Sequence, residues 1–169
     1  NADEPKLQIH DVPADGNCLF SSVALSMALT DHVPASARAR AVRTAANRLR
    51  VEANDLLCPS GLPDPEPILG ELPASLVVEP LRGEGERGYC TRMRQPGQWG
   101  STAEILALTI ILARPIRVCT PFGLEVYGSE KVDGETRGQH RRPLAIHFAN
   151  DHYRAVTAVE DPDGPKQEL

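Results

Sequence analysis

The order of apolar and polar positions predicts helices in the first two thirds of the chain. Residues 18–29 are apolar almost all round, which is typical of a buried helix. Within residues 36–54, five apolar residues recur at helical spacing: Val42, Ala45, Ala46, Leu49 and Ala53. We expect a second helix there, capped by Ser36. Its arginines then fall mostly on the outer face, as a solvated helix surface rather than a nucleic-acid patch.

The middle of the chain predicts irregular segments and one further helix. Prolines recur through residues 58–73, which favours a surface loop with one helical turn around residues 68–72. Residues 76–88 read as a short apolar element that enters a glycine-rich, charged loop. In residues 99–113, Ser101 and Glu104 have the spacing of a capping box ahead of a strongly apolar helix.

The last third changes to the alternation that is typical of strands. Four short runs are separated by Gly, Pro and Asn-Asp turns: 115–121, 123–128, 143–149 and 152–159. Helices followed by strands favour an α+β fold, with the helices packed on a small, mostly antiparallel sheet formed by the C-terminal third. We expect one domain over residues 1–159, which begins with an extended lead-in, and a flexible tail at residues 160–169.

Composition and charge narrow the classes of partner. The chain has 169 residues, of which 41% are hydrophobic and 24% charged, as in a globular protein. The formal net charge of −5 provides no basic footprint for nucleic acid and suits a basic or neutral polypeptide. No apolar run approaches the roughly 18 residues that cross a bilayer. We therefore expect a soluble monomer with no nucleic-acid or membrane partner.

Four cysteines are scattered along the chain, at Cys18, Cys58, Cys90 and Cys119. They show neither C-x-x-C spacing nor zinc-ligand intervals with histidine, so we expect no metal and no redox motif. Two disulfides would suit a secreted protein, but that class is usually shorter and richer in cysteine. We expect a reducing compartment, the cytoplasm.

The candidate chemistry begins at the stretch ADGNCLFSS, residues 14–22. Cys18 opens the first predicted helix, where unpaired peptide N–H groups and the helix dipole favour a thiolate, the nucleophilic form of the side chain. Backbone N–H groups of the turn that precedes it, in Asp15, Gly16 and Asn17, and of Cys18 itself can stabilise an oxyanion. Gly16 permits a tight turn and a close approach to a substrate carbonyl.

A nucleophilic thiol needs a base, and the chain has five histidines. His152 is the best candidate because it follows an Asn-Asp turn and opens a predicted strand. His147, in the preceding strand, is more typical of a packed or capping group. Asn150 or Asp151 could orient the ring of His152.

Three blocks of sequence resemble the ovarian tumour (OTU) family of papain-like cysteine proteases. They are D-G-N-C-L-F at 15–20, W-G-S-T-A-E-I at 99–105 and N-D-H-Y-R-A-V at 150–156. The resemblance implies a thiol hydrolase without a cofactor. Its substrate would be the peptide or isopeptide bond after the C-terminal Gly-Gly of ubiquitin or a ubiquitin-like modifier.

Carried over to this chain, the family pattern makes Cys18 the nucleophile, His152 the base and Asp15 a loop-ordering and electrostatic residue. Asn150 is expected as the third triad member, because alternate residues on a strand point the same way. Many relatives instead place an acid two residues after the histidine, where this chain has Arg154.

The middle block also departs from the family pattern, because Ser101 replaces a common second glycine. Trp99 is expected either as a packing anchor or as a wall of the narrow channel for the Gly-Gly tail, and Glu104 as a helix cap.

Two other functions remain open at this point. One is a polyprotein-processing protease of the same fold, as found among viral relatives. The other is a catalytically inactive module that binds ubiquitin. For a virus or a secreted bacterial effector, the expected compartment is the host cytosol.

Overall fold

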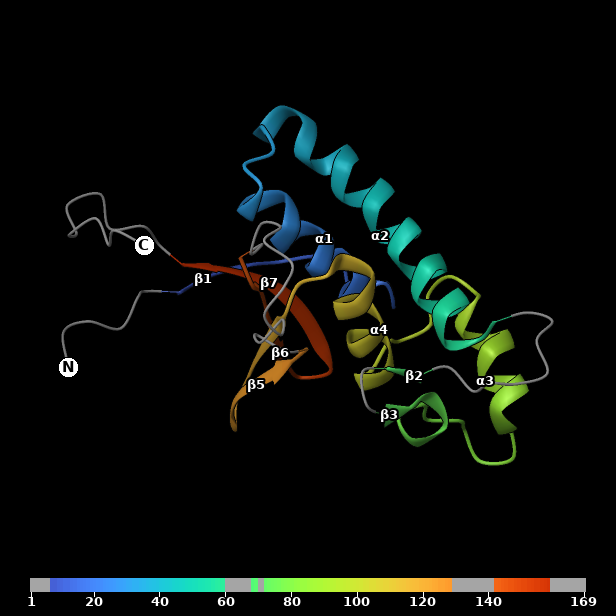
Figure 1. Cartoon of the computed structure of the whole chain (residues 1–169). Coiled ribbons are helices and arrows are strands. Elements are labelled where there is room, and N and C mark those ends of the chain that lie inside the picture. Colours follow the sequence, from blue (N-terminus) through green and yellow to red (C-terminus); the bar gives the residue numbers. More distant parts are fainter. Residues whose placement is uncertain (1–6, 60–67, 70–71, 129–141, 159–169) are drawn as a thin grey trace, which may run out of the picture.

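Four helices and a five-stranded sheet account for most of the fold (Figure 1). The computed structural model describes residues 7–59, 68–69, 72–128 and 142–158. The helices are α1 (Cys18–Thr30), α2 (Ala35–Leu57), α3 (Gly85–Met93) and α4 (Thr102–Leu112). The sheet contains β1 (Leu7–His10), β4 (Ile116–Thr120), β5 (Gly123–Tyr127), β6 (Leu144–Ala149) and β7 (His152–Ala158). The expected α+β class is confirmed.

The sheet has the strand order β1-β7-β6-β4-β5. The pair β4–β6 is parallel, whereas β1–β7, β6–β7 and β4–β5 are antiparallel, so the sheet is mostly antiparallel as expected. The N-terminal lead-in contributes more than predicted. As β1 it pairs with β7 in the register His10↔Ala155, and the sheet is therefore not built from the C-terminal third alone.

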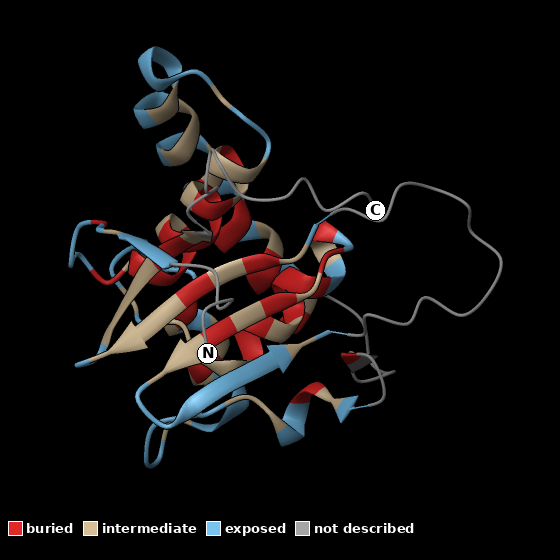
Figure 2. Ribbon diagram, turned by 90° about the vertical axis from the view of Figure 1, so that its left-hand side faces the viewer, coloured by how far each residue is buried: buried red, intermediate tan, exposed pale blue. Residues whose placement is uncertain are grey.

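The core lies where α1 is enclosed between the sheet and α2. Leu19 and Phe20 of α1 are 1% exposed, and Ile116 and Ile146 reach them from the central strands with no exposed surface. Buried residues lie mainly on the helices behind the sheet and in its central strands, whereas the edge strand β5 is largely exposed (Figure 2). Among the described helices, none is both long and apolar enough to cross a bilayer.

The longest helix starts before its predicted cap. Helix α2 begins at Ala35 with Pro34 as its N-cap residue, so Ser36 lies inside the first turn. Residues 35–45 contain no buried side chain, and the buried face begins at Ala46. The predicted outer face for the arginines holds for most of them, but Arg50 is buried.

Two predictions for the middle of the chain are wrong. Part of the predicted glycine-rich loop forms α3, because Tyr89 and Met93, one helical turn apart, bury their side chains against the core. The helical turn expected around residues 68–72 is absent from the described residues of that segment. The two short strands β2 (Ile68–Leu69) and β3 (Leu72–Pro73) pair there instead, followed by the 3-10 turn η1 (Ala74–Leu76).

The predicted tail at 160–169 lies outside the described residues.

A disulfide joins Cys58 to Cys90, a pair that is not typical of the expected reducing compartment. The two residues are 32 positions apart, and their Cα atoms lie 5.8 Å from one another because α3 packs against the C-terminal end of α2. Spacing along the sequence gave no signal for this pair, since the contact exists only after the helices have packed. Cys18 and Cys119 remain free thiols.

Opening this disulfide should destabilise the fold. Closing a loop of this length removes chain entropy from the unfolded state worth about 3–4 kcal/mol. We expect the double variant Cys58→Ser/Cys90→Ser to lose a free energy of unfolding of that order in urea denaturation. Reductant should destabilise the wild type by a similar amount and leave the double variant unchanged. Equal stability of the oxidised wild type and the variant would contradict this expectation.

Candidate active site

Cys18 is the first residue of α1 and follows a turn whose backbone is held by Asp15. The Asn17 N–H donates to Asp15 Oδ1 at 3.0 Å, which orders the turn as the family resemblance implied for Asp15. Gly16 has φ +76°, and a Cβ atom there would collide with the backbone of Gly97. The positive φ fits the tight turn predicted for Gly16, and the close approach of Gly97 is a further reason for glycine at this position.

The buried guanidinium of Arg50 connects this turn to the rest of the site. Its Nε donates to Asn17 Oδ1 at 2.9 Å, and its Nη2 donates to the carbonyls of Gly16 at 2.9 Å and Gln98 at 2.6 Å. The cation also stacks 4.5 Å from the ring centroid of Phe20. Helix α2, the turn before α1 and the loop after α3 are thus held by a single side chain.

Burial lowers the pKa of Arg50, while the carboxylates of Glu104 and Asp15 oppose this effect. The guanidinium nevertheless stays charged, because arginine keeps its proton at all ordinary pH values. Its positive charge attracts the thiolate form of Cys18. Arg50 therefore contributes both to the shape of the turn and to its electrostatics.

The N-terminus of α1 has no side-chain cap. Asn17 occupies the N-cap position, where its side-chain oxygen would ordinarily accept from a first-turn N–H, but that oxygen accepts from Arg50 instead. The first-turn N–H groups around Cys18 are consequently left for another acceptor. Of the four predicted oxyanion donors, Asn17 is unsuitable, because its N–H already donates to Asp15.

A cavity of about 290 Å³ opens beside Cys18, and aromatic rings form part of its lining. The chain has one tryptophan, three tyrosines and three phenylalanines. Four of these seven line the cavity, namely Tyr89, Trp99, Phe148 and Tyr153. Trp99 is 63% exposed, so it forms a wall of the cavity and not a packing anchor.

His152 opens β7 as predicted, after a tight turn. Asn150 and Asp151 have φ values of +53° and +56°, and Ala149 pairs with His152, which defines a two-residue hairpin. The residues on either side of His152, Asp151 and Tyr153, line the Cys18 cavity. The ring of His152 is held through Nε2, 3.1 Å from the Val12 carbonyl oxygen.

The structure thus brings the β6–β7 hairpin to the cavity of Cys18. No hydrogen bond between Cys18 and His152 occurs within the described residues. The argument that placed Asn150 beside His152 fails, because Asn150 lies in the turn and not on a strand, so strand alternation does not apply to it. Neither His152 nor His147 itself lines the cavity; His147 lies opposite Arg154 in β6.

A second buried group, Glu104, contacts two residues that line the cavity, Tyr89 and Ser101. Its carboxylate accepts from the Ser101 N–H at 2.7 Å, which confirms the predicted capping box of α4. It also accepts a hydrogen bond from the Tyr89 hydroxyl. Burial, and then the charge of Glu104, raise the pKa of Tyr89 well above its ordinary value, so the phenol remains a donor. The hydrogen bond from Tyr89 to Glu104 thereby joins α3 to α4.

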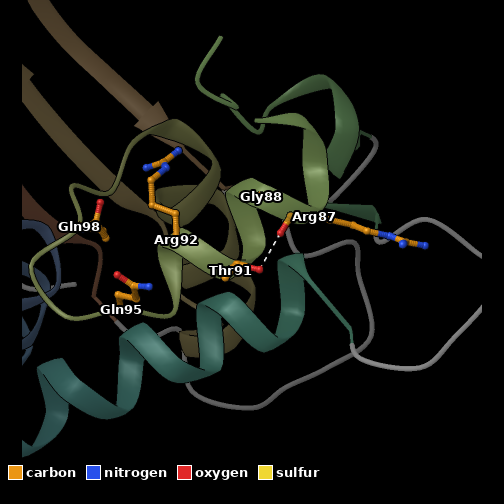
Figure 3. Close-up of a pocket in the computed structure, with 6 residues that line it drawn as sticks. All are labelled: Arg87, Gly88, Thr91, Arg92, Gln95 and Gln98. Carbon is orange, nitrogen blue, oxygen red and sulfur yellow. Dashed lines mark hydrogen bonds between the residues drawn. The ribbon is translucent and has the colours of Figure 1, made fainter. Parts of the chain in front are cut away.

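A larger hollow of about 560 Å³ lies on the outer side of α3 (Figure 3). It is lined by Arg87, Gly88, Thr91, Gln95 and Gln98, with Arg92 shared with the Cys18 cavity, and most of the lining surface is apolar. The lining contains no thiol, imidazole or carboxylate side chain, and Arg92 is paired with Glu84 at 2.8 Å. Catalytic chemistry is therefore better placed at the smaller cavity.

Arg50 was missed by the sequence analysis, although a signal was present. It lies four residues after Ala46 and three before Ala53, on the face of the helix that these apolar residues define. A single arginine on an apolar helix face indicates a buried cation with specific acceptors.

Replacing Arg50 should disorder the turn before Cys18. In Arg50→Met, the carbonyls of Gly16 and Gln98 and the Asn17 side chain lose a charged donor, so we expect a loss of about 2–4 kcal/mol in the free energy of unfolding. We also expect slower alkylation of Cys18 at neutral pH. The control is Arg48→Met, which removes an exposed pair with Glu52 and should change stability by less than about 0.5 kcal/mol. Equal behaviour of the two variants would exclude this role.

Comparison with known proteins identifies the family of the chain. The family model described as OTU-like cysteine protease matches residues 13–154. No curated protein sequence matches the chain. Among solved structures, the viral OTU domain protease from Taggert virus is similar at 15% identity and a TM-score of 0.59, over 92% of this chain and 81% of that one.

Two further structures show the same fold. The OTU domain of OTUD1 is 19% identical, with a TM-score of 0.55 over 89% of this chain and 85% of that one. An OTU deubiquitinase from Wolbachia pipientis wMel bound to ubiquitin is 12% identical, with a TM-score of 0.52 over 90% and 96%. The family match spans the turn before Cys18, the Trp99 segment and the His152 hairpin. The chain belongs to the family of OTU-like cysteine proteases.

Proposed function

We propose that this protein is a deubiquitinase that hydrolyses the peptide or isopeptide bond after the C-terminal glycine of ubiquitin or a ubiquitin-like modifier. The observation that carries the proposal is the position of Cys18, at an uncapped helix N-terminus and on an aromatic-walled cavity. Two similar OTU domains have been solved bound to ubiquitin, one from Hazara virus and one from Wolbachia pipientis.

The cavity suits the chemistry of a ubiquitin tail. A Gly-Gly end has no side chains and can lie between Trp99 and the rings of the β6–β7 hairpin. Glu79 and Asp151 add negative charge to the lining, which favours a tail that carries arginines before its glycines. The net charge of −5 acts in the same direction at longer range.

In the proposed reaction the Cys18 thiol transfers its proton to His152, and the thiolate attacks the carbonyl carbon of the terminal glycine. First-turn N–H groups of α1 stabilise the oxyanion. The tetrahedral species collapses, the C–N bond breaks, and His152 returns the proton to the departing amine. Water, deprotonated by His152, then hydrolyses the thioester and regenerates the thiol.

An exposed apolar surface borders the cavity and provides a place for the folded body of the modifier. Leu76 is 71% exposed, Leu81 is 60% exposed and Trp99 is 63% exposed. Leu81 and Trp99 also line the cavity, and Leu76 lies five residues before Leu81 in the chain. Large exposed apolar side chains beside a functional cavity are typical of a protein-binding site.

The central test is turnover of a fluorogenic ubiquitin substrate cleaved after the terminal glycine. We expect activity in the wild type, none above background in Cys18→Ala, and a loss of about 100- to 10,000-fold in His152→Ala, because a general base is removed. Cys119→Ala is the matched control. Burial raises the pKa of Cys119, which keeps this second free thiol protonated, so its removal should leave turnover unchanged.

The outcomes separate the competing functions. Absence of turnover together with binding of ubiquitin would indicate an inactive binding module. Cleavage of native flanking sequence without cleavage of ubiquitin would indicate a processing protease. Turnover that survives Cys18→Ala would exclude the proposed nucleophile.

The exposed apolar surface generates a separate prediction. Leu81→Glu and Leu76→Glu should each raise KM for the ubiquitin substrate by about five- to ten-fold, because a charge is placed where the modifier buries apolar area. Alkylation of Cys18 by iodoacetamide should not change. Phe122→Glu is the control, since Phe122 is 99% exposed in the β4–β5 turn and does not line the cavity. An equal KM for all three variants would remove the surface from the binding site.

We propose that the protein acts in the cytoplasm, or in the host cytosol for a viral or secreted bacterial protein, where thiol–disulfide systems keep a nucleophilic cysteine reduced; the same systems act against the Cys58–Cys90 disulfide. We further propose that the protein acts as a monomer, which size-exclusion chromatography with light scattering would test.

A further inference from the structure

The segment between β1 and α1 brings a carboxylate to His152. Because β1 pairs with β7 in the register His10↔Ala155, the residues that follow His10 continue alongside the start of β7. Asp11 Oδ1 lies 3.0 Å from Arg154 Nε and 3.4 Å from His152 Nε2. One carboxylate oxygen therefore contacts both side chains.

The partners of His152 define which ring nitrogen carries the proton. Nε2 faces the Val12 carbonyl oxygen at 3.1 Å and the Asp11 carboxylate at 3.4 Å, and both groups are acceptors. The neutral ring consequently keeps its hydrogen on Nε2, which leaves the lone pair on Nδ1. A general base for a thiol needs such a free nitrogen, fixed in direction by contacts at the other one. The His152 side chain is only 12% exposed, so its ring is largely shielded from water where it makes these contacts.

From this geometry we propose that Asp11 is the positioning residue of His152, held in place by Arg154. The inference rests on the proposed function, in which His152 is the base. In this chain the carboxylate comes from the segment between β1 and α1, whereas many relatives place an acid two residues after the histidine. At that position this chain has Arg154, whose guanidinium does not replace the acid but binds one supplied by another segment.

The charges around Asp11 support this role. Desolvation, the largest single effect, favours the neutral acid, but the hydrogen bonds and charges of Arg154 and His152 together outweigh it and lower the pKa of Asp11. The carboxylate therefore remains ionised throughout the pH range in which an imidazole titrates. As the thiol proton reaches Nδ1, the ring becomes a cation, and Asp11 stabilises that cation.

Other charged groups near His152 are less suited. Asp151 precedes it in the turn and lines the cavity, and His147 lies beside Arg154 in β6. Cys18 opens α1 on the other side of the cavity. Asn150 is neutral and exposed in the turn. Asp11 is the carboxylate for which a contact with the ring is found in the described part of the chain.

The first experiment does not depend on ubiquitin. In the Cys18→Ala background, the NMR titration of the His152 ring is followed in the presence and absence of Asp11→Asn. We expect the midpoint to move to lower pH in Asp11→Asn, because the imidazolium loses its counter-charge. Glu52→Gln, which removes an exposed carboxylate paired with Arg48 on α2, should leave the midpoint unchanged. An unchanged midpoint in Asp11→Asn would overturn the proposal even if the protein cleaves ubiquitin.

The second experiment uses turnover. Since Asp11 is 77% exposed, solvent weakens the pair, and we expect Asp11→Asn to lower kcat/KM about two- to five-fold. The loss should fall on kcat with KM unchanged, and the acidic limb of the pH profile should move to lower pH, because the neutral form of the base is reached at a lower pH. The double variant Asp11→Asn/Arg154→Asp, which returns an acid to β7, should recover activity relative to Asp11→Asn. A loss confined to KM or to thermal stability would show that Asp11 has only a structural role.

If the wild type cleaves no ubiquitin substrate while the titration shifts as expected, the proposed function fails and the assignment of Asp11 stands.

Discussion

The active-site geometry depends on the burial of one cation. Arg50 is 6% exposed, and its donors are shared among Gly16, Asn17 and Gln98, which lie on two loops that are distant in sequence. A buried guanidinium is tolerated only when its N–H groups have hydrogen-bond acceptors. Moving any of these acceptors away would leave a buried charged donor unpaired, so the two loops are fixed in position. The turn before Cys18 therefore owes its shape to a helix that contributes no atom to the reaction.

The same contact explains why the start of α1 lacks a cap. An asparagine at this position ordinarily satisfies a first-turn N–H, which stabilises a helix by about 1 kcal/mol. In this chain the Asn17 side chain is turned toward Arg50. The helix gives up that stabilisation, and its first-turn N–H groups are left without a side-chain acceptor. The shape of the turn and the uncapped start of α1 thus have a common origin in Arg50.

Much of the fold could be predicted because its signals are local. The all-round apolar run of α1, the capping box of α4 and the Asn-Asp turn before β7 depend only on neighbouring residues, and the structure contains all three. The contributions of Arg50 and Asp11 and the pairing of Cys58 with Cys90 arise from contacts between segments 32 or more residues apart, which no local pattern reports. Helix α3 was missed because its glycines and charges outweighed the single spacing of Tyr89 and Met93. The position of Asn150 was misjudged because strand alternation was extended into a turn.

The stretch from His10 to Cys18 is anchored at both ends, by strand pairing with β7 and by the start of α1. Between these anchors lie Asp11, Val12 and Asp15, each with a partner elsewhere in the fold or in the turn. Insertion or deletion of even one residue here would shift some of these groups away from their partners. Evolution of this lineage is therefore expected to vary the length of its other loops, and to change this stretch only by substitution.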